Sequence, residues 1–417
     1  MTPPQRTKTH KTDSAWTIWP VGLATALSLM GDATMYSVLP THYADAGIAL
    51  TSVGLILSVN RFIRLLTNGP AGWLFDRLAN RRILFIGSLA LGIFTTILYA
   101  TTSGLGLLCI ARLLWGLAWS GIWIGGTAIV LQMAPAAQRG HWVGIYQVWF
   151  FFGSAIGSFF GGAFTDTVGY RNGLWIGAGV SLIGALAAVF ALSARHTSNQ
   201  NAASVTTHWR TSIIIHWRGV SPAMWATAIA QGVNRLASSG IVAATLGLVV
   251  QQNIGGGLHL GTWQFGVASA TGGLLAARTM FSLVGAPIAG TMSDRLSERW
   301  GLLSLCLAIS AVGVAILPMP RVIALMGGTI ISAIASGGVQ SLATTLVGDL
   351  SKMQEQGKHL AIFNIAGDFG SAIGPLVAYA LLPVTGLIAV YWGCAILMLL
   401  NAFWIIRFKR TSPALRQ

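Results

Sequence analysis

Apolar residues are grouped along this chain in long runs, separated by short segments that contain charges, prolines or polar residues. A helix that spans a membrane needs about 20 predominantly apolar residues. Dividing the sequence at its polar interruptions predicts twelve such helices. They lie near residues 17–39, 52–75, 82–102, 105–130, 143–165, 172–193, 222–250, 262–290, 301–318, 322–347, 360–382 and 386–406. The pattern therefore predicts an all-α membrane protein.

The composition agrees with this interpretation. Hydrophobic residues make up 54% of the chain and charged residues 8%, whereas about a quarter of the residues in an average soluble domain are charged. The first apolar run follows Arg6, Lys8 and Lys11 and resembles the start of a signal peptide. It is longer than the apolar core of a signal peptide and lacks a clear cleavage site, so we expect it to be the first spanning helix.

The distribution of basic residues predicts the orientation in the membrane. The net charge is +15, which by itself would suit a nucleic-acid partner. However, most Lys and Arg residues fall at the termini and in alternate loops, and the opposite loops hold only Arg171 and Arg321. Because positive loops stay on the cytoplasmic side, we expect both termini in the cytoplasm, a location in the plasma membrane, and no nucleic-acid partner.

Two short sequences occur once in each half of the chain. The sequence FGSAIG is found at Phe152–Gly157 and again at Phe369–Gly374, and GWLFDRL at Gly72–Leu78 is echoed by GTMSDRL at Gly290–Leu296. The copies fall on corresponding helices, which indicates a duplication of six helices in parallel orientation. We therefore expect six-helix bundles at residues 1–195 and 221–417, joined by a polar cytoplasmic linker at 196–220.

Three segments in the first half of the chain resemble motifs of a known family. The sequence GWLFDRLANRR follows the second span, RLLWG lies in the fourth and GIYQVWFFFGSAIGSFFGG in the fifth. The matching residues are Gly72, Asp76, Arg77, Arg81 and Arg82, then Arg112 and Gly116, then Gly144, Gly153, Gly157, Gly161 and Gly162. Ala79, Asn80 and Ser158 depart from the family patterns. The chain resembles the major facilitator superfamily of secondary transporters, especially its twelve-helix drug and proton antiporters.

The resemblance implies a fold with two pseudo-symmetric bundles that rock against each other around a small-molecule substrate. It also implies gating roles on the cytoplasmic side for Gly72, Asp76 and Arg77, and for their echoes Gly290, Asp294 and Arg295. Gly153, Gly157 and Gly161 form a stripe of small residues that allows close helix approach. We expect this stripe at the contact between the two bundles, with static packing as the alternative.

Charged residues inside the predicted spans are the strongest candidates for a functional site, because burying charge in a membrane is costly. They are Asp32, Arg61, Arg64, Arg112, Arg235, Arg278 and Asp368. Asp32 and Arg61 are expected at similar depth, which allows an ion pair, and a contact of Arg64 with Asp368 across the two halves is a second candidate. Buried structural pairing is the alternative for Arg61 and Arg64.

Two transport functions remain open at this point. A carboxylate beside an arginine, such as Asp32 with Arg112, can exchange a proton for substrate, which favours proton-coupled export of small organic compounds. The excess of arginine over aspartate in the spans instead favours a permease for organic anions or zwitterions. A non-transporting scaffold or receptor of the same fold is a third alternative.

Other classes lack support in the sequence. No HExxH, CxxC, Ser-His-Asp or P-loop pattern is visible, so we expect no enzymatic activity, no metal site and no cofactor. Aromatic residues of the fourth and fifth spans either line a cavity for flat apolar molecules or face the lipid. They are Trp115, Trp119, Trp123, Tyr146 and Trp149.

Overall fold

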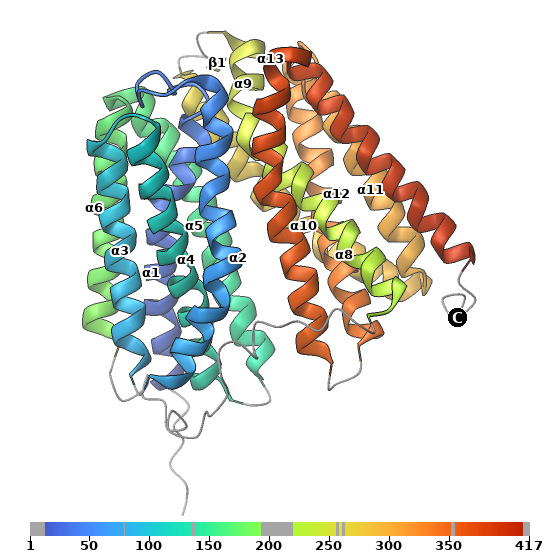
Figure 1. The fold of residues 1–417 in the computed structure, drawn as a ribbon, viewed down its shortest axis with the longest axis horizontal. Coiled ribbons are helices and arrows are strands. Elements are labelled where there is room, and N and C mark those ends of the chain that lie inside the picture. Colours follow the sequence, from blue (N-terminus) through green and yellow to red (C-terminus); the bar gives the residue numbers. More distant parts are fainter. Residues whose placement is uncertain are drawn as a thin grey trace, which may run out of the picture.

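The computed structural model describes residues 13–78, 80–135, 138–192, 220–255, 258–260, 263–351 and 355–411. Apart from one short hairpin, the regular structure in these ranges is helical (Figure 1). The first half contains α1 (Asp13–Val38), the short η1 (Leu50–Ser52), α2 (Val53–Arg77), α3 (Arg81–Thr101), α4 (Leu105–Met133), α5 (Arg139–Val168) and α6 (Tyr170–Ala191). The second half contains α8 (Pro222–Arg235), the π-helical η4 (Leu236–Val242), α9 (Ala243–Ile254), β1 (Leu258–Leu260), β2 (Trp263–Phe265), α10 (Val267–Leu296), α11 (Arg299–Ile316), α12 (Val322–Leu350) and α13 (Gln356–Thr411).

These helices account for the twelve predicted spans. Ten helical segments of the described chain are long and apolar enough to cross a membrane, and α8, η4 and α9 together form one of them. The last segment is two helices in succession, because Gly386 has a φ of 76° and interrupts the helical backbone of α13. The remaining predicted span corresponds to α1. The all-α, twelve-span prediction is confirmed.

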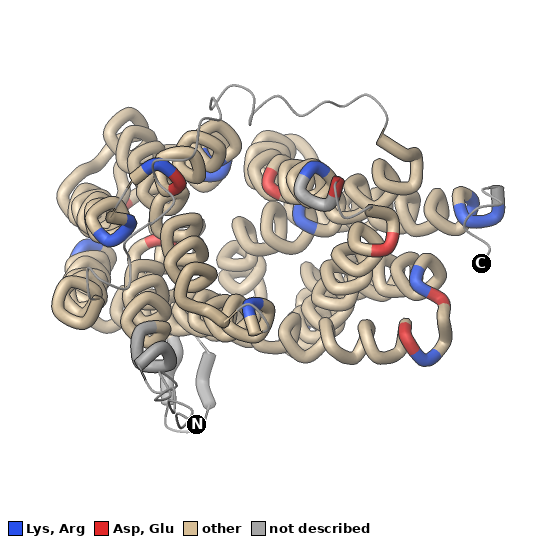
Figure 2. Tube along the Cα trace, turned by 90° about the horizontal axis from the view of Figure 1, so that it is seen from below, with Lys and Arg blue, Asp and Glu red and all other residues tan. Residues whose placement is uncertain are grey.

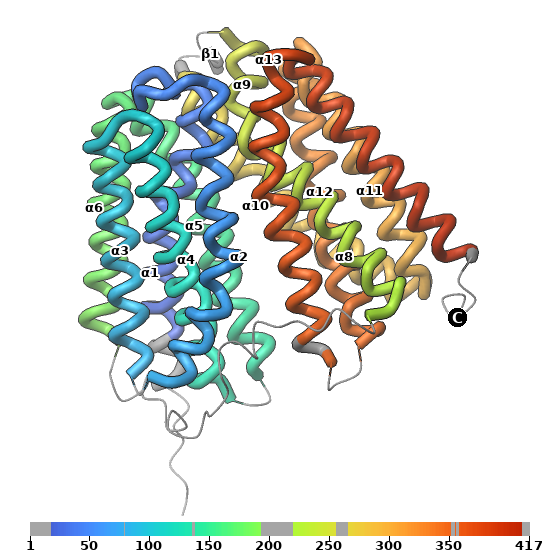
Figure 3. Tube along the Cα trace, in the orientation of Figure 1, coloured from blue at the N-terminus to red at the C-terminus, as the bar shows by residue number. Residues whose placement is uncertain are grey.

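The helices form two groups, α1–α6 and α8–α13, that repeat the same packing (Figure 3). In the first group, α5 lies against α1, and a β-carbon on Gly153 would overlap the backbone of Ala26. In the second group, α13 lies against α8, where Gly370 meets the backbone of Gly232 in the same way. The two FGSAIG copies thus make equivalent contacts. The proposed boundaries at 195 and 221 remain predictions, and the expected linker lies outside the described residues except for Val220.

The two groups meet at the end of the molecule that carries β1 and diverge toward the other end (Figure 1). We call these the outer and inner ends, following the orientation that the charges predict. At the outer end, Gly54 of α2 lies against Pro375 of α13, and Gly272 of α10 lies against Ser158 of α5. These positions correspond between the repeats, so the interface has the same pseudo-symmetry as the bundles.

One polar contact reinforces this interface. The Asp166 carboxylate of α5 accepts hydrogen bonds from the Ser269 backbone N–H at 2.7 Å and from its hydroxyl at 2.6 Å. Ser269 lies in the first turn of α10, where unpaired N–H groups and the helix dipole favour a negative charge. Asp166 thereby joins the two groups at their outer ends. Sequence reasoning did not select this residue, although it is an acid at the end of a span.

The glycine stripe on α5 does not lie where we expected. Gly153, Gly157 and Gly161 contact α1 of their own group, and the neighbouring face, with Ser158 and Gly162, contacts α10 of the other group. Sequence spacing identified a face of small residues but could not tell which of two neighbouring helices would cover it. A role for the stripe in the conformational change remains a prediction.

Replacing Gly54 with leucine is expected to open the outer end. A larger side chain would overlap the Pro375 carbonyl and Tyr379, and overpacking typically costs about 1–3 kcal/mol. The cost applies only while the outer ends are packed together. Spin labels on Ala44 and Gln251, in a variant without native cysteines, should therefore report a longer distance. Gly179→Leu is the control, because a β-carbon at Gly179 meets no atom within 4 Å. An unchanged distance in Gly54→Leu would contradict the proposed packing constraint.

Candidate functional site

Asp32 of α1 and Arg112 of α4 form an ion pair inside the first group. The Arg112 side chain is fully buried, whereas that of Asp32 is 17% exposed. Asp32 also accepts a hydrogen bond from the Asn60 amide at 3.3 Å, and Arg112 donates one from Nε to the Ile56 carbonyl at 3.1 Å. The hydrogen bond to Ile56 thus fixes Arg112 against α2, and part of the Asp32 side chain remains accessible to solvent.

The ion pair that similar depth allowed between Asp32 and Arg61 is not formed. Arg61 of α2 instead reaches the second group, where its Nη1 donates to the carbonyls of Ser239 and Ser371, each at 2.7 Å. Ser239 lies in η4, where the backbone hydrogen bonding departs from the α-helical pattern. Depth along a helix, which sequence can estimate, does not determine the direction in which a side chain points.

Tyr36 connects these two arginines. Its ring centroid lies 5.0 Å from the Arg61 guanidinium carbon and 5.6 Å from that of Arg112, and both distances are within cation–π range. The Tyr36 hydroxyl donates to the Leu57 carbonyl at 3.2 Å, which fixes the ring. The Tyr36 ring therefore lies between the Asp32–Arg112 pair and Arg61, which joins the two groups. Tyr36 and Asn60 were not selected from sequence, although both are polar residues within a turn of a charged one.

A second ion pair, unlike the first, joins the two groups of helices. Nη2 of Arg64 lies 3.5 Å from Oδ1 of Asp368, and their side chains are 23% and 29% exposed. This is the contact that sequence reasoning placed between α2 and α13. Arg235 of α8 interacts electrostatically with Asp368, Arg61 and Arg64, so these four residues form one cluster between the groups.

Arg278 makes its contacts separately. It is buried in the second group, where it donates to the Ser332 hydroxyl at 2.9 Å and to the Ser238 carbonyl at 3.4 Å. These contacts join α10 to α12 and η4. The structure thus holds Arg278 by polar groups of its own bundle.

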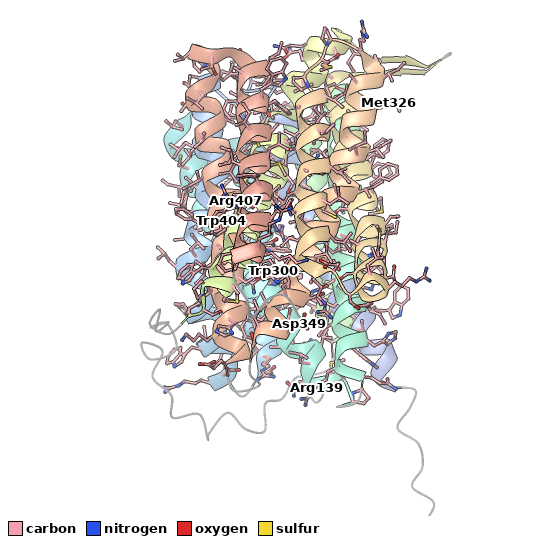
Figure 4. All side chains as sticks on the ribbon, turned by 90° about the vertical axis from the view of Figure 1, so that its right-hand side faces the viewer. Arg139, Trp300, Met326, Asp349, Trp404 and Arg407 are labelled. Carbon is pink, nitrogen blue, oxygen red and sulfur yellow. The ribbon has the colours of Figure 1, made fainter. Side chains whose placement is uncertain are left out.

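The inner-end motifs form equivalent ion pairs in both groups. Asp76 lies 3.6 Å from Arg81, and Arg81 donates to the Gln132 side chain of α4 at 3.0 Å. In the second copy, Asp294 lies 3.7 Å from Arg299, which also pairs with Asp349 of α12. Figure 4 shows Asp349 toward the inner end of α12, and Met326 toward the other end of the same helix. Each arginine therefore ties an inter-helix turn to the helix that follows in its own group.

The remaining motif residues have less constrained surroundings. Arg77 stacks on Trp73, with its guanidinium carbon 4.6 Å from the ring centroid, and Arg295 is exposed. A β-carbon on Gly72 or Gly290 would make only ordinary contacts. Asn80, which departs from the family pattern, caps α3 by accepting a hydrogen bond from the Arg82 backbone N–H at 3.1 Å. Seen from below Figure 1, basic and acidic segments lie next to each other at several points of the trace (Figure 2).

The aromatic residues of α4 and α5 mostly form packing contacts. Trp115, Trp119 and Tyr146 are buried in the first group, and the Tyr146 hydroxyl is 3.0 Å from that of Thr25. Neither the lipid-facing nor the cavity-lining interpretation applies to these three. Their spacing on the helices was visible in the sequence, but their partners on neighbouring helices were not.

The chain matches the sequence model of the Major Facilitator Superfamily over residues 21–278 and, in a second overlapping match, over residues 227–417. These matches cover most of the chain, and the protein belongs to this superfamily. Its family and fold indicate a membrane transporter rather than an enzyme.

Curated relatives with several activities match part of the chain. The probable galactarate/D-glucarate transporter GudP of Escherichia coli (strain K12) is 27% identical over 159 residues, which are 37% of this chain and 35% of that protein. Citrate exporter 1 of Aspergillus niger is 27% identical over 169 residues, 40% of this chain and 32% of the exporter. The quinolone resistance protein NorA of Staphylococcus aureus (strain Mu50 / ATCC 700699) is 23% identical over 137 residues, 32% of this chain and 35% of NorA. Each alignment spans about a third of the relative.

Solved structures resemble the whole chain. A bacterial homologue of the human lysosomal transporter Spinster, in an inward-facing and occupied conformation, superposes with a TM-score of 0.80 at 13% identity and covers 98% of this chain and 99% of its own. A POT family transporter in complex with 5-aminolevulinic acid has a TM-score of 0.74 at 14% identity, with 96% of each chain covered. At such identities the similarity establishes the fold.

Charge reversal in the inner-end motif is expected to slow the conformational cycle. Asp76→Lys replaces the attraction to Arg81 with repulsion in a turn that has to keep its shape while the bundles move. We expect turnover to fall by about tenfold, equivalent to about 1.4 kcal/mol in the barrier, with a smaller effect on substrate affinity. Flux and binding measured in parallel would test this, with Asp45→Lys in an exposed outer loop as the control. An unchanged rate would remove Asp76 from gating.

Proposed function

We propose that the protein is a proton-coupled secondary transporter that exports small organic compounds by alternating access. The observation that carries the proposal is the partly exposed Asp32 carboxylate paired with the buried Arg112, because a membrane-embedded carboxylate of this kind can take up and release a proton. The proposal assigns the proton to Asp32 and the substrate to the region between the two groups.

Alternating access is supported by the way the two groups meet. They pack at the outer end through Gly54, Gly272 and Asp166, and their helices diverge toward the inner end (Figure 1). In the proposed orientation, with both termini in the cytoplasm and the protein in the plasma membrane, this arrangement faces inward. Opening the outer end would require the cross-group contacts of α2, α5, α10 and α13 to separate.

Coupling between proton and movement follows from the contacts of Tyr36. Protonation of Asp32 would remove the counter-charge of Arg112, whose guanidinium shares the Tyr36 ring with Arg61. Arg61 in turn holds two carbonyls of the second group. A change of charge at Asp32 would thus alter the electrostatic surroundings of a contact that keeps the outer end closed. Asn60 and Tyr99 are the other polar neighbours of the pair.

The relatives support both transport functions that the sequence left open. The name of citrate exporter 1 suits export, whereas that of the galactarate/D-glucarate transporter suits a permease for organic anions. The second function is favoured by the excess of arginine over aspartate between the groups. The experiment below distinguishes the two by whether protons move with the compound.

Asp32→Asn is expected to abolish proton coupling while the protein remains folded. The amide retains the size and the hydrogen-bonding capacity of the carboxylate but cannot exchange a proton at neutral pH. Purified protein in sealed proteoliposomes with an imposed pH gradient would be given lipophilic cations, neutral drugs and organic anions, with internal pH as the readout. Asp45→Asn is the matched control, since Asp45 is exposed in an outer loop. Coupling that persists in Asp32→Asn would rule out Asp32 as the proton carrier, and anion flux without any proton movement would favour the permease.

A further inference from the structure

Three arginines and one aspartate are gathered between the two groups of helices. Arg61 and Arg64 come from α2, Arg235 from α8 and Asp368 from α13. The electrostatic contacts of Arg235 extend to all three of the others. The cluster therefore carries more positive than negative charge within the span of the membrane.

The partners of these residues differ. Arg61 donates to two backbone carbonyls, and Arg64 pairs with the Asp368 carboxylate while its buried Nε has no hydrogen-bond partner among the residues that the structure describes. Arg235 is partly exposed, and in the described part of the chain no hydrogen bond or ion pair involves its guanidinium. Its stem lies close to Gly367, one residue before Asp368. The cluster thus contains one arginine that makes no ion pair within the described residues, although Asp368 and two other arginines act on it electrostatically.

Such an arrangement is costly unless an anion binds to it. Arginines within a membrane normally pair with an acid or with backbone carbonyls. A guanidinium presents a planar set of donors that matches a carboxylate in a two-point contact. Asp368 alone cannot neutralise three guanidinium groups, so the cluster is incomplete as an ion-pair network and complementary to a ligand with negative charge.

We propose that Arg235 and Arg64 bind a small organic anion through its carboxylate groups, and that Asp368 is the internal counter-ion that the anion displaces. The inference rests on the proposed function and names the substrate class of its central site. In the absence of substrate, Asp368 pairs with Arg64. When the anion binds, its carboxylate takes this place, and the helices α2, α8 and α13 are drawn together around it.

The proposal predicts opposite effects from two neutralising substitutions. Arg235→Gln removes the unpartnered guanidinium and should weaken anion binding by about tenfold or more, the effect of losing one charge-assisted contact. Asp368→Asn removes the competing carboxylate and should tighten binding by about tenfold. A purely structural Arg64–Asp368 pair would give no gain in affinity in the second variant.

The test is equilibrium binding to the full chain in nanodiscs at fixed pH, followed by calorimetry. Succinate, citrate and benzoate are the probes, and succinamide and tetraphenylphosphonium are the uncharged and cationic comparisons. Arg321→Gln, in an exposed outer position, is the control variant and should bind as the wild type does. Arg235→Lys keeps the charge but loses the planar donors, so it should retain part of the affinity, and it serves in place of Arg235→Gln if that variant does not fold.

Binding of at least one carboxylate probe, with the two opposite shifts, would support the inference. It would be overturned if none of the three anions binds, if tetraphenylphosphonium or succinamide binds instead, or if Asp368→Asn weakens anion binding. These outcomes are independent of proton coupling. Wild-type protein that binds no anion but releases protons with a neutral or cationic compound would overturn this inference alone, and protein that binds succinate without proton-linked flux would overturn the proposed function alone.

Discussion

Arg61 makes the contact on which the closed outer end most depends. A charged side chain within a membrane has to find partners, and Arg61 finds two carbonyls on the opposite group of helices. This ties α2 to η4 and α13 across the interface between the groups. The close approach of Gly54 to Pro375 and the bond from Ser269 to Asp166 lie farther out along the same interface. The outer contacts can separate only if the carbonyls that Arg61 holds are released.

The two halves share the same helix contacts but differ in the charged residues near their middle. The glycine contacts of α5 with α1 and of α13 with α8 correspond, as do the inner-end pairs of Asp76 with Arg81 and of Asp294 with Arg299. The charges near the middle do not follow the repeat. The Asp32–Arg112 pair belongs to the first group, whereas Arg235 and Asp368 belong to the second. Repetition supplies two bodies that can rock against each other, and this asymmetry gives each a separate task in the proposed mechanism.

Sequence alone could predict the features that depend on position along a helix. Apolar runs gave the twelve spans, and repeated motifs gave the correspondence between halves. The contact of Arg64 with Asp368 was a candidate because both charges were expected inside spans, and the structure forms it. The sequence left two partners open for Asp32, Arg61 and Arg112, and the structure pairs it with Arg112, because the rotation of each helix decides between them. For the same reason, the glycine stripe was assigned to the wrong neighbour.

The most direct test of the account is the separation of the two groups when the Arg61 bridge is removed. Spin-label distances would be measured across the outer end, between Ala44 and Gln251, and across the inner end, between Gly140 and Ser297, in wild type, Arg61→Lys and Arg61→Gln. The account predicts that Arg61→Gln lengthens the outer distance and shortens the inner one, with Arg61→Lys in between because lysine still donates to carbonyls. Equal distances in all three proteins would show that Arg61 does not hold the outer end closed.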